Sequence, residues 1–313
     1  MQKKSEIKIV FMGTPQFAVP SLCTLIENNY NVEAVVTVPD KPGGRGLRLE
    51  ASEVKKVAES YKIPILQPEK MKDKLFIQEM EAIAPSIIVV AAFRILPPEV
   101  YKLAKLGSFN LHASLLPKYR GAAPINRAIM NGETKTGITT FFLEDKVDAG
   151  SIIFQKEIDI NEDESYGEVY DRLSKLGASL VIKTVDAIID NDISTSIQEE
   201  TNITQAPKIF KNDCLINWEL PSRTIHNHIR GLAPYPTAYT RYENKNVKIF
   251  KSELSNKTGN HKAGYISISK SDIFVSSADY DLKILELQME GKKRLKSEEF
   301  LRGFHFSEGS CFY

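Results

Sequence analysis

Cysteine is scarce in this sequence and is never clustered. The 313 residues include Cys23, Cys214 and Cys311, which are far apart and form neither a C-x-x-C pair nor a Cys/His ligand spacing. This pattern predicts no disulfide framework and no zinc site. His226 and His228 are two residues apart, so on a helix they would point to nearly opposite sides. We therefore expect no bound metal.

Long apolar runs and a strong net charge are also missing. No run approaches the roughly 20 apolar residues that cross a bilayer, and the first residues, MQKKSEIKIVFMGTP, are better interpreted as a first strand than as a signal peptide. We predict a cytoplasmic protein without a membrane segment. The net charge is only +1, with 24 basic against 28 acidic residues up to position 207 and 17 against 12 beyond it. This asymmetry is either ordinary scatter or the sign of a C-terminal module that meets a polyanion.

The glycine motifs of nucleotide-binding proteins are absent as well. Gly13 belongs to GTPQF rather than to G-x-G-x-x-G, and GGRG (43–46) lacks the Lys-Ser/Thr of a phosphate loop. The first half instead alternates apolar, β-branched strands such as IKIVFM (7–12) and SIIVVAA (86–92) with helical segments. Such repeated units predict a Rossmann-like, mostly parallel sheet with helices on both faces.

The pattern of apolar and polar residues changes after a predicted long helix. This helix is predicted to begin at Ser165, where Glu168 completes a capping box, and to end near residue 190. Residues 191–207 lose the helical periodicity and are rich in Thr, Ser and Asn, so we interpret them as a linker. Short alternating segments and polar turns in residues 208–313 predict a small antiparallel barrel or sandwich. The predicted domains are therefore 1–190 and 208–313.

One stretch, FNLHASLLPKYRGAAP (109–124), contains candidate catalytic residues. Asn110 and His112 stand two apart in a short predicted strand, so their side chains should share one face. The strand ends at the carboxyl edge of the sheet, where ligands bind in such folds. A lone histidine near apolar residues is more often structural. The neighbouring amide of Asn110 favours a catalytic role instead, because an amide can donate to a developing oxyanion while the imidazole carries a proton.

A carboxylate should complete this group. The segment LEDKVDAGSIIF (143–154) offers Glu144, Asp145 and Asp148. Asp148 precedes Ala149-Gly150, where the chain turns into the next strand and its backbone can approach a ligand. We therefore predict Asp148 as the partner and expect the other two carboxylates to be solvated.

These residues resemble the folate-dependent formyltransferases, in which an Asn, a His and an Asp surround the formyl carbon of 10-formyltetrahydrofolate. The loop PDKPGGRGLRLE (39–50) and the segment GKKRLKSEEFLRG (291–303) extend the resemblance, over essentially the whole chain, to the branch that formylates methionine on initiator tRNA. The alternative is an aminosugar formyltransferase, which uses the same donor but generally lacks this loop. A non-catalytic RNA-binding protein of the same shape is disfavoured because Asn110, His112 and Asp148 are all present.

The resemblance also implies the binding residues. It places the folate donor against Ser114, Leu115, Leu116, Pro117, Ala91, Ala92, Phe93 and Ile95. It implies that a C-terminal barrel of the oligonucleotide-binding type holds the tRNA through phosphates, and the candidate contacts are Lys41, Arg45, Arg48, Lys208, Lys211 and Lys248, with Arg241, Lys245 and Lys251 as further basic residues. Nothing in the sequence demands more than a monomer, and the expected partners are the initiator tRNA and the folate donor.

Overall fold

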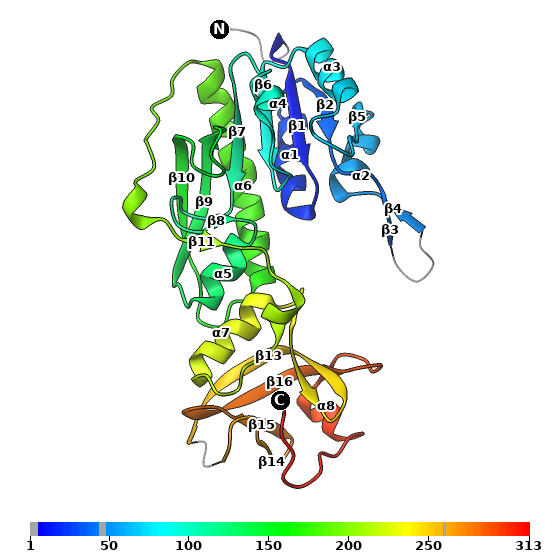
Figure 1. The fold of residues 1–313 in the computed structure, drawn as a ribbon, viewed down its shortest axis with the longest axis vertical. Coiled ribbons are helices and arrows are strands. Elements are labelled where there is room, and N and C mark those ends of the chain that lie inside the picture. The colour runs from blue at the N-terminus through cyan, green and yellow to red at the C-terminus, as the bar shows by residue number, and fades with distance from the viewer. Residues whose placement is uncertain (1–5, 44–47, 259–260) are drawn as a thin grey trace. The chain divides into compact units, whose positions relative to one another are not determined.

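The computed structural model describes residues 6–43, 48–258 and 261–313 (Figure 1). Its contacts divide the chain into two compact units. The first unit comprises Met1–Gly121, Gly137–Ile158 and Tyr170–Gln205, and the second comprises Ala122–Thr136, Asp159–Val169 and Ala206–Tyr313. By this division most of the segment that we interpreted as a linker belongs to the first unit. The domain limits stay a prediction.

A seven-stranded mixed sheet forms the first unit. Its strands are, in spatial order, β10 (Ile152–Asp159), β9 (Lys135–Phe142), β7 (Gly107–His112), β6 (Ile87–Ala91), β1 (Ile9–Gly13), β2 (Val32–Val36) and β5 (Ile65–Leu66). The five strands from β7 to β5 are parallel, and β9 runs antiparallel to β7. Every residue of β1 and β6 is buried, as the continuous apolar runs predicted. The predicted mostly parallel, Rossmann-like sheet is confirmed.

Helices lie on both faces of this sheet. They are η2 (Gln16–Ala18), α1 (Val19–Glu27), α2 (Glu53–Ser60), α3 (Lys74–Ile83), α4 (Pro98–Tyr101) and α6 (Tyr166–Ile189). Helices α3 and α4 contribute Phe76, Met80 and Val100 to an apolar cluster that includes Val90 of β6. Helix α6 reaches strand β9 from the other face, because the hydroxyl of Thr184 hydrogen-bonds that of Thr140 at 2.9 Å. The capping box predicted at the start of α6 is present: the backbone N–H of Ser165 donates to the Glu168 carboxylate.

The predicted loop at residues 39–50 carries a short hairpin. Strands β3 (Lys41–Gly43) and β4 (Arg48–Glu50) pair antiparallel and extend away from the sheet (Figure 1). At the base of the hairpin, Lys55 donates to Asp40 at 2.6 Å and to Gln67 at 3.0 Å, and the Gln67 amide donates back to Asp40. These contacts fix the point at which the hairpin leaves the fold.

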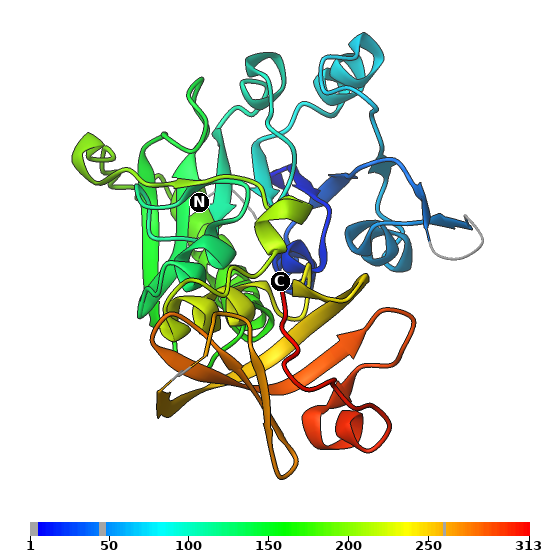
Figure 2. The ribbon, with the colours of Figure 1, turned by 60° about the horizontal axis from the view of Figure 1, so that its bottom comes forward.

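An antiparallel sheet curls into a barrel in the second unit (Figure 2). Its strands are β12 (Ala238–Tyr242), β13 (Lys245–Thr258), β16 (Tyr280–Met289), β15 (Asp272–Ser276) and β14 (Ile266–Ser269), and β17 (Leu295–Lys296) pairs with β16. The last residues of the chain close the gap between the two edge strands. Phe312 donates to Gly264 beside β14, and Tyr313 exchanges two backbone hydrogen bonds with Arg241 of β12. The predicted small barrel is confirmed.

Helical and short extended segments complete the fold. They are β8 (Arg120–Gly121), α5 (Pro124–Met130), η3 (Glu200–Asn202), β11 (Gln205–Ala206), η4 (Lys211–Cys214), α7 (Ser222–Leu232) and α8 (Ser297–Leu301). The apolar side of α7, with Ile225, Ile229 and Leu232, packs into the barrel core beside Trp218. In the described ranges, no helix is long and apolar enough to span a membrane.

Candidate functional site

Strand β7 carries Asn110 and His112 on one face of the sheet, as predicted from their spacing. Leu111 between them points to the opposite face, where a Cβ built on Gly177 of α6 would lie only 2.6 Å from its Cδ2 atom. The close packing of α6 against Leu111 therefore fixes the strand from behind. Asn110 and His112 are left on the face that α6 does not cover.

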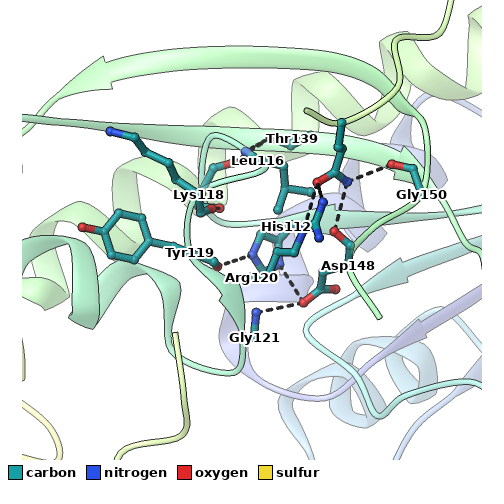
Figure 3. Close-up of polar contacts among 11 residues, drawn as sticks. His112, Leu116, Lys118, Tyr119, Arg120, Gly121, Thr139, Asp148 and Gly150 are labelled. Carbon is teal, nitrogen blue, oxygen red and sulfur yellow. Dashed lines mark hydrogen bonds and ion pairs between the residues drawn. The ribbon is translucent and has the colours of Figure 1, made fainter. Parts of the chain in front are cut away.

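The imidazole of His112 is held in one orientation. It is 6% exposed, and its Nε2 lies 2.9 Å from the backbone oxygen of Tyr119 (Figure 3). A carbonyl oxygen can only accept, so Nε2 carries the hydrogen and Nδ1 is the free nitrogen of the neutral ring. The ring also stands edge-on to Phe141 at a centroid distance of 6.4 Å. Backbone and packing together direct Nδ1 toward Asp148.

Asp148 is brought to His112 by an unusual backbone conformation. Its φ is +52°, in the left-handed region that residues other than glycine seldom adopt. The Oδ2 atom accepts a hydrogen bond of 2.9 Å from the Gly121 N–H and lies 4.0 Å from His112 Nδ1 (Figure 3). The structure thus places the predicted histidine and carboxylate together, with a gap slightly longer than a direct hydrogen bond.

Asn110 completes the group on the same strand face. It is paired with Val90 of β6 on one side and with Phe141 of β9 on the other. Its side chain is partly exposed, and within the described part of the chain its carboxamide makes no hydrogen bond. The carboxamide donors are therefore available to a bound molecule.

The two neighbouring carboxylates are exposed, as we expected, and their hydrogen bonds go to groups other than His112. Asp145 accepts a hydrogen bond of 2.5 Å from the Tyr101 hydroxyl, and Glu144 accepts one from the Ser151 backbone. The bond to Asp145 raises the pKa of Tyr101 to about 12, because it holds the phenol proton beside a carboxylate. The same bond lowers the pKa of Asp145. Of the three carboxylates, Asp148 is the one that faces His112.

The loop Ser114 to Pro117 is tied to the neighbouring strands. The Thr139 hydroxyl of β9 donates to the Ser114 carbonyl and accepts from the Leu116 N–H. Gln155 of β10 donates to the Leu116 carbonyl at 2.8 Å, while Ser114 is fully buried and donates to Lys118. Leu115 and Pro117 are partly exposed, and the bond before Pro117 is cis. The loop is therefore rigidly placed beside the end of β7.

The turn after β6 forms without a glycine. Ala91 ends the buried strand, and Ala92 takes the left-handed conformation with φ +47°. Phe93 packs partly into the apolar cluster, and Arg94 donates to the carbonyls of residues 68 and 69. Ile95 is 72% exposed, which leaves an apolar surface at this turn.

The predicted tRNA contacts are distributed over both units. Lys41 is exposed on β3, Arg45 lies outside the described residues, and Arg48 begins β4. Lys208, Lys211 and Lys248 of the second unit are exposed, as are Arg241, Lys245 and Lys251. Their role stays a prediction. Among the described residues, no three His, Cys, Asp or Glu side chains form a group that could hold a metal.

Several residues of this site were not predicted from the sequence. Tyr119 and Gly121 act through backbone groups, and Gln155 acts through its side-chain amide on β10. Gln198 lies in the segment interpreted as a linker, yet it is 5% exposed and donates to the backbone oxygens of Asp148 and Gly150. A polar, aperiodic segment contains no local signal for such a buried contact.

A doubly wound α/β unit with an Asn–His–Asp group at the carboxyl end of a central strand, joined in sequence to a small barrel, defines a class of group-transfer enzyme. The sequence profile described as "Formyl transferase" matches residues 7–185, and "Formyl transferase, C-terminal domain" matches residues 208–305. The chain belongs to the formyl transferase family. The resemblance drawn from its sequence is confirmed.

Individual relatives agree with this assignment. The chain is 47% identical, over 98% of both sequences, to the methionyl-tRNA formyltransferase of Bacteroides fragilis. It is 44% identical to that of Flavobacterium johnsoniae over 98% of this chain and 99% of the relative. Among solved structures, a sugar 3N-formyl transferase crystallised with dTDP and 5-N-formyl-THF superposes with a TM-score of 0.69 at 24% identity, covering 92% of this chain and 99% of the other. This last likeness shows a shared fold.

Proposed function

We propose that this enzyme transfers the formyl group of 10-formyltetrahydrofolate to the α-amino group of methionine on initiator methionyl-tRNA. The observation that carries the proposal is the identity of 42–47% with methionyl-tRNA formyltransferases along nearly the entire chain. The second unit and the hairpin at residues 39–50 are included in this similarity. The proposal extends to a monomer that acts in the cytoplasm.

In the reaction, the amine nitrogen bonds to the formyl carbon while the carbonyl electrons move to oxygen. The C–N bond to the folate nitrogen then breaks, that nitrogen gains a proton, and the new amide nitrogen loses one. We assign Asn110 to the oxyanion, because its carboxamide is free and hydrogen-bond donors are most effective where negative charge develops. Its position at the end of β7 is fixed from behind by α6.

His112 and Asp148 handle the proton in this assignment. The Nε2–H bond to Tyr119 leaves Nδ1 able to accept a proton, and Nδ1 faces Asp148 at 4.0 Å. Once His112 is protonated, the attraction of the carboxylate stabilises the imidazolium. Either His112 shuttles the proton while Asp148 orients it, or Asp148 accepts the amine proton through a water molecule.

The binding residues follow from the same assignment. Ser114, Leu115, Leu116 and Pro117 would contact the folate on one side, with Ala91, Ala92, Phe93 and Ile95 at the neighbouring turn. The exposed apolar side chain of Ile95 and the anchored loop at Ser114 support this placement. Lys41, Arg45 and Arg48 would contact the acceptor end of the tRNA, and Lys208, Lys211 and Lys248 its phosphates.

An aminosugar formyltransferase is the competing assignment. The solved sugar formyltransferase shares the fold but only 24% of residues, whereas the methionyl-tRNA relatives share up to 47%. These identities favour the tRNA substrate.

The test presents 10-formyltetrahydrofolate with initiator Met-tRNA, elongator Met-tRNA, free methionine or an amino-sugar nucleotide. Acid-stable formylmethionine should form efficiently with the initiator tRNA only. Formylation of the amino-sugar nucleotide without formylation of Met-tRNA would establish the competing assignment.

A further inference from the structure

A buried glutamine amide ties the Asp148 turn to the loop that faces it. The Gln198 Oε1 atom accepts from Arg120 Nε at 3.1 Å and from Arg120 Nη2 at 2.6 Å. Its Nε2 donates to the backbone oxygen of Asp148 at 3.0 Å and to that of Gly150 at 2.8 Å. An amide offers two donors and two acceptor lone pairs, so every one of them is used.

Arg120 orients this amide. It is 6% exposed, and two nitrogens of its guanidinium donate to the Gln198 oxygen. The guanidinium has no acceptor atoms, so only the oxygen of Gln198 can face it. The amide nitrogen must then face the carbonyls of Asp148 and Gly150. Burying the guanidinium charge without hydrogen-bond partners would cost free energy, so the bonds to Gln198 stabilise it.

Gln198 bonds to the backbone of the turn that orients the Asp148 carboxylate. Asp148 has a φ of +52°, a left-handed conformation that is unfavourable in a residue other than glycine, so the surrounding contacts must maintain it. The turn is also tightly enclosed: a Cβ on Gly150 would lie 1.8 Å from the Phe142 oxygen. The carbonyl of Asp148 faces Gln198, while its carboxylate faces Gly121 and His112.

The segment that contains Gln198 also fixes the loop at residues 119–121. Thr204 accepts from the Tyr119 N–H through its hydroxyl and from the Arg120 N–H through its carbonyl. Ser196 exchanges two backbone hydrogen bonds with Ile152 at 2.8 and 3.0 Å. Residues 196–204 therefore connect the turn that carries Asp148 to the loop whose backbone holds His112 and the Asp148 carboxylate.

We propose that Gln198 is a positioning residue for formyl transfer, oriented by Arg120, which keeps the Asp148 carboxylate 4.0 Å from His112 Nδ1. This proposal rests on the assigned role of Asp148 in the proposed function. Gln198 is 5% exposed, and its amide N–H groups donate to the Asp148 and Gly150 carbonyls, through which it acts. Its loss should lower kcat while leaving KM for both substrates close to that of the wild type.

Gln198→Glu is the decisive variant. Its carboxylate can still accept from Arg120, and the resulting ion pair protects the fold, but it cannot donate to the two carbonyls. We expect the variant to stay folded at the assay temperature, with a lower thermal midpoint because two buried carbonyls lose their donor, and kcat to fall up to about 100-fold, the cost of a misplaced group. Thr184→Val is the control, because it removes a buried hydrogen bond of the same unit on the face away from the site, and kcat should be unchanged.

Double-mutant kinetics separate this proposal from the proposed function. If Gln198 acts through Asp148, Gln198→Glu should have almost no effect in an Asp148→Asn background. The same fold-loss in both backgrounds would overturn the positioning role, as would a wild-type kcat for Gln198→Glu. A wild-type kcat for Asp148→Asn alone would instead overturn the assigned role of Asp148.

Discussion

His112 Nδ1 lies 4.0 Å from Asp148 Oδ2, while Nε2 of the same ring donates to the Tyr119 carbonyl at 2.9 Å. The nitrogen with the basic lone pair is therefore the one that faces the carboxylate. A proton taken up at Nδ1 would lie between ring and carboxylate, where the negative charge stabilises it. This arrangement assigns different tasks to the two ring nitrogens: Nε2 orients the ring and Nδ1 handles the proton.

The two tasks can be separated by substitution. In His112→Gln, the amide nitrogen can replace Nε2 and donate to Tyr119, but no basic atom replaces Nδ1. We expect this variant to fold with a thermal midpoint near that of the wild type and to lose about 100- to 10,000-fold in kcat, the usual range for general acid–base catalysis. Single-turnover formylation with saturating donor measures the loss.

His112→Asn provides the comparison. Its shorter amide approximates Nδ1 and leaves the buried Tyr119 carbonyl without its donor, so it should also unfold at a lower temperature. Wild-type turnover in His112→Gln would show that Nδ1 takes no part in the proton transfer.

Asn110→Ala should lower kcat without unfolding the protein. The carboxamide makes no hydrogen bond within the described chain, so its removal costs little stability. The lost oxyanion donor should cost about 3–4 kcal/mol, or 100- to 1,000-fold in kcat. Asn31→Ala, at a partly exposed position just before β2 and away from β7 in the sheet, is the control and should keep full turnover. Equal kcat values for Asn110→Ala and the wild type would remove Asn110 from the mechanism.

The basic side chains should make tRNA binding strongly dependent on salt. Each phosphate contact releases counterions, so the apparent affinity for Met-tRNA should fall steeply between 50 and 200 mM salt, whereas donor affinity changes little. Arg45→Ala should weaken tRNA binding and reduce the slope of log affinity against log salt by about one. Filter binding with labelled tRNA measures both quantities. A flat salt response would contradict the phosphate contacts, and equal losses for donor and tRNA would indicate misfolding.

The elements that could be predicted from the sequence are those with a strong period. β1 and β6 are continuous apolar strands, β7 alternates polar and apolar residues at its end, and α6 combines a capping box with a regular apolar face. The barrel strands show clear alternation between polar turns. Closure of the barrel could not be predicted, because it depends on backbone pairing of Phe312 and Tyr313 with residues about 50 and 70 positions away.

The candidate site divides in the same way. Asn110 and His112 could be placed on one face because a strand has a period of two residues. Their partners Tyr119, Gly121 and Gln198 could not, since they act through backbone groups or from an aperiodic segment. Asp148 was predicted from its neighbours Ala149-Gly150, yet its left-handed backbone gives no sign in the sequence. Local patterns reveal side chains on regular elements, and tertiary contacts decide how those side chains are held.

A buried histidine in the second unit gives the fold a pH dependence of its own. His226 on α7 is 2% exposed, its Nδ1 lies 3.0 Å from the Ser252 hydroxyl, and its Nε2 lies 3.2 Å from Asp163. Burial lowers the pKa of His226 from the usual 6.5, Arg230 and Arg223 lower it further, and Asp163 partly opposes them. Burial likewise lowers the pKa of His228.

A lowered histidine pKa means that the unfolded chain binds the proton more tightly than the folded one. The free energy of unfolding of the second unit should therefore be highest above pH 6.5 and should fall as the pH decreases toward the folded-state pKa. Trp218, the single tryptophan, is buried in this unit and hydrogen-bonded to Thr240, so its fluorescence reports the transition. In urea unfolding between pH 5 and 7.5, His226→Asn should show a smaller decrease than the wild type, because its amide approximates Nδ1, can keep a hydrogen bond to Ser252 and does not titrate. An identical pH slope in the two proteins would show that His226 is protonated equally in the folded and unfolded chains.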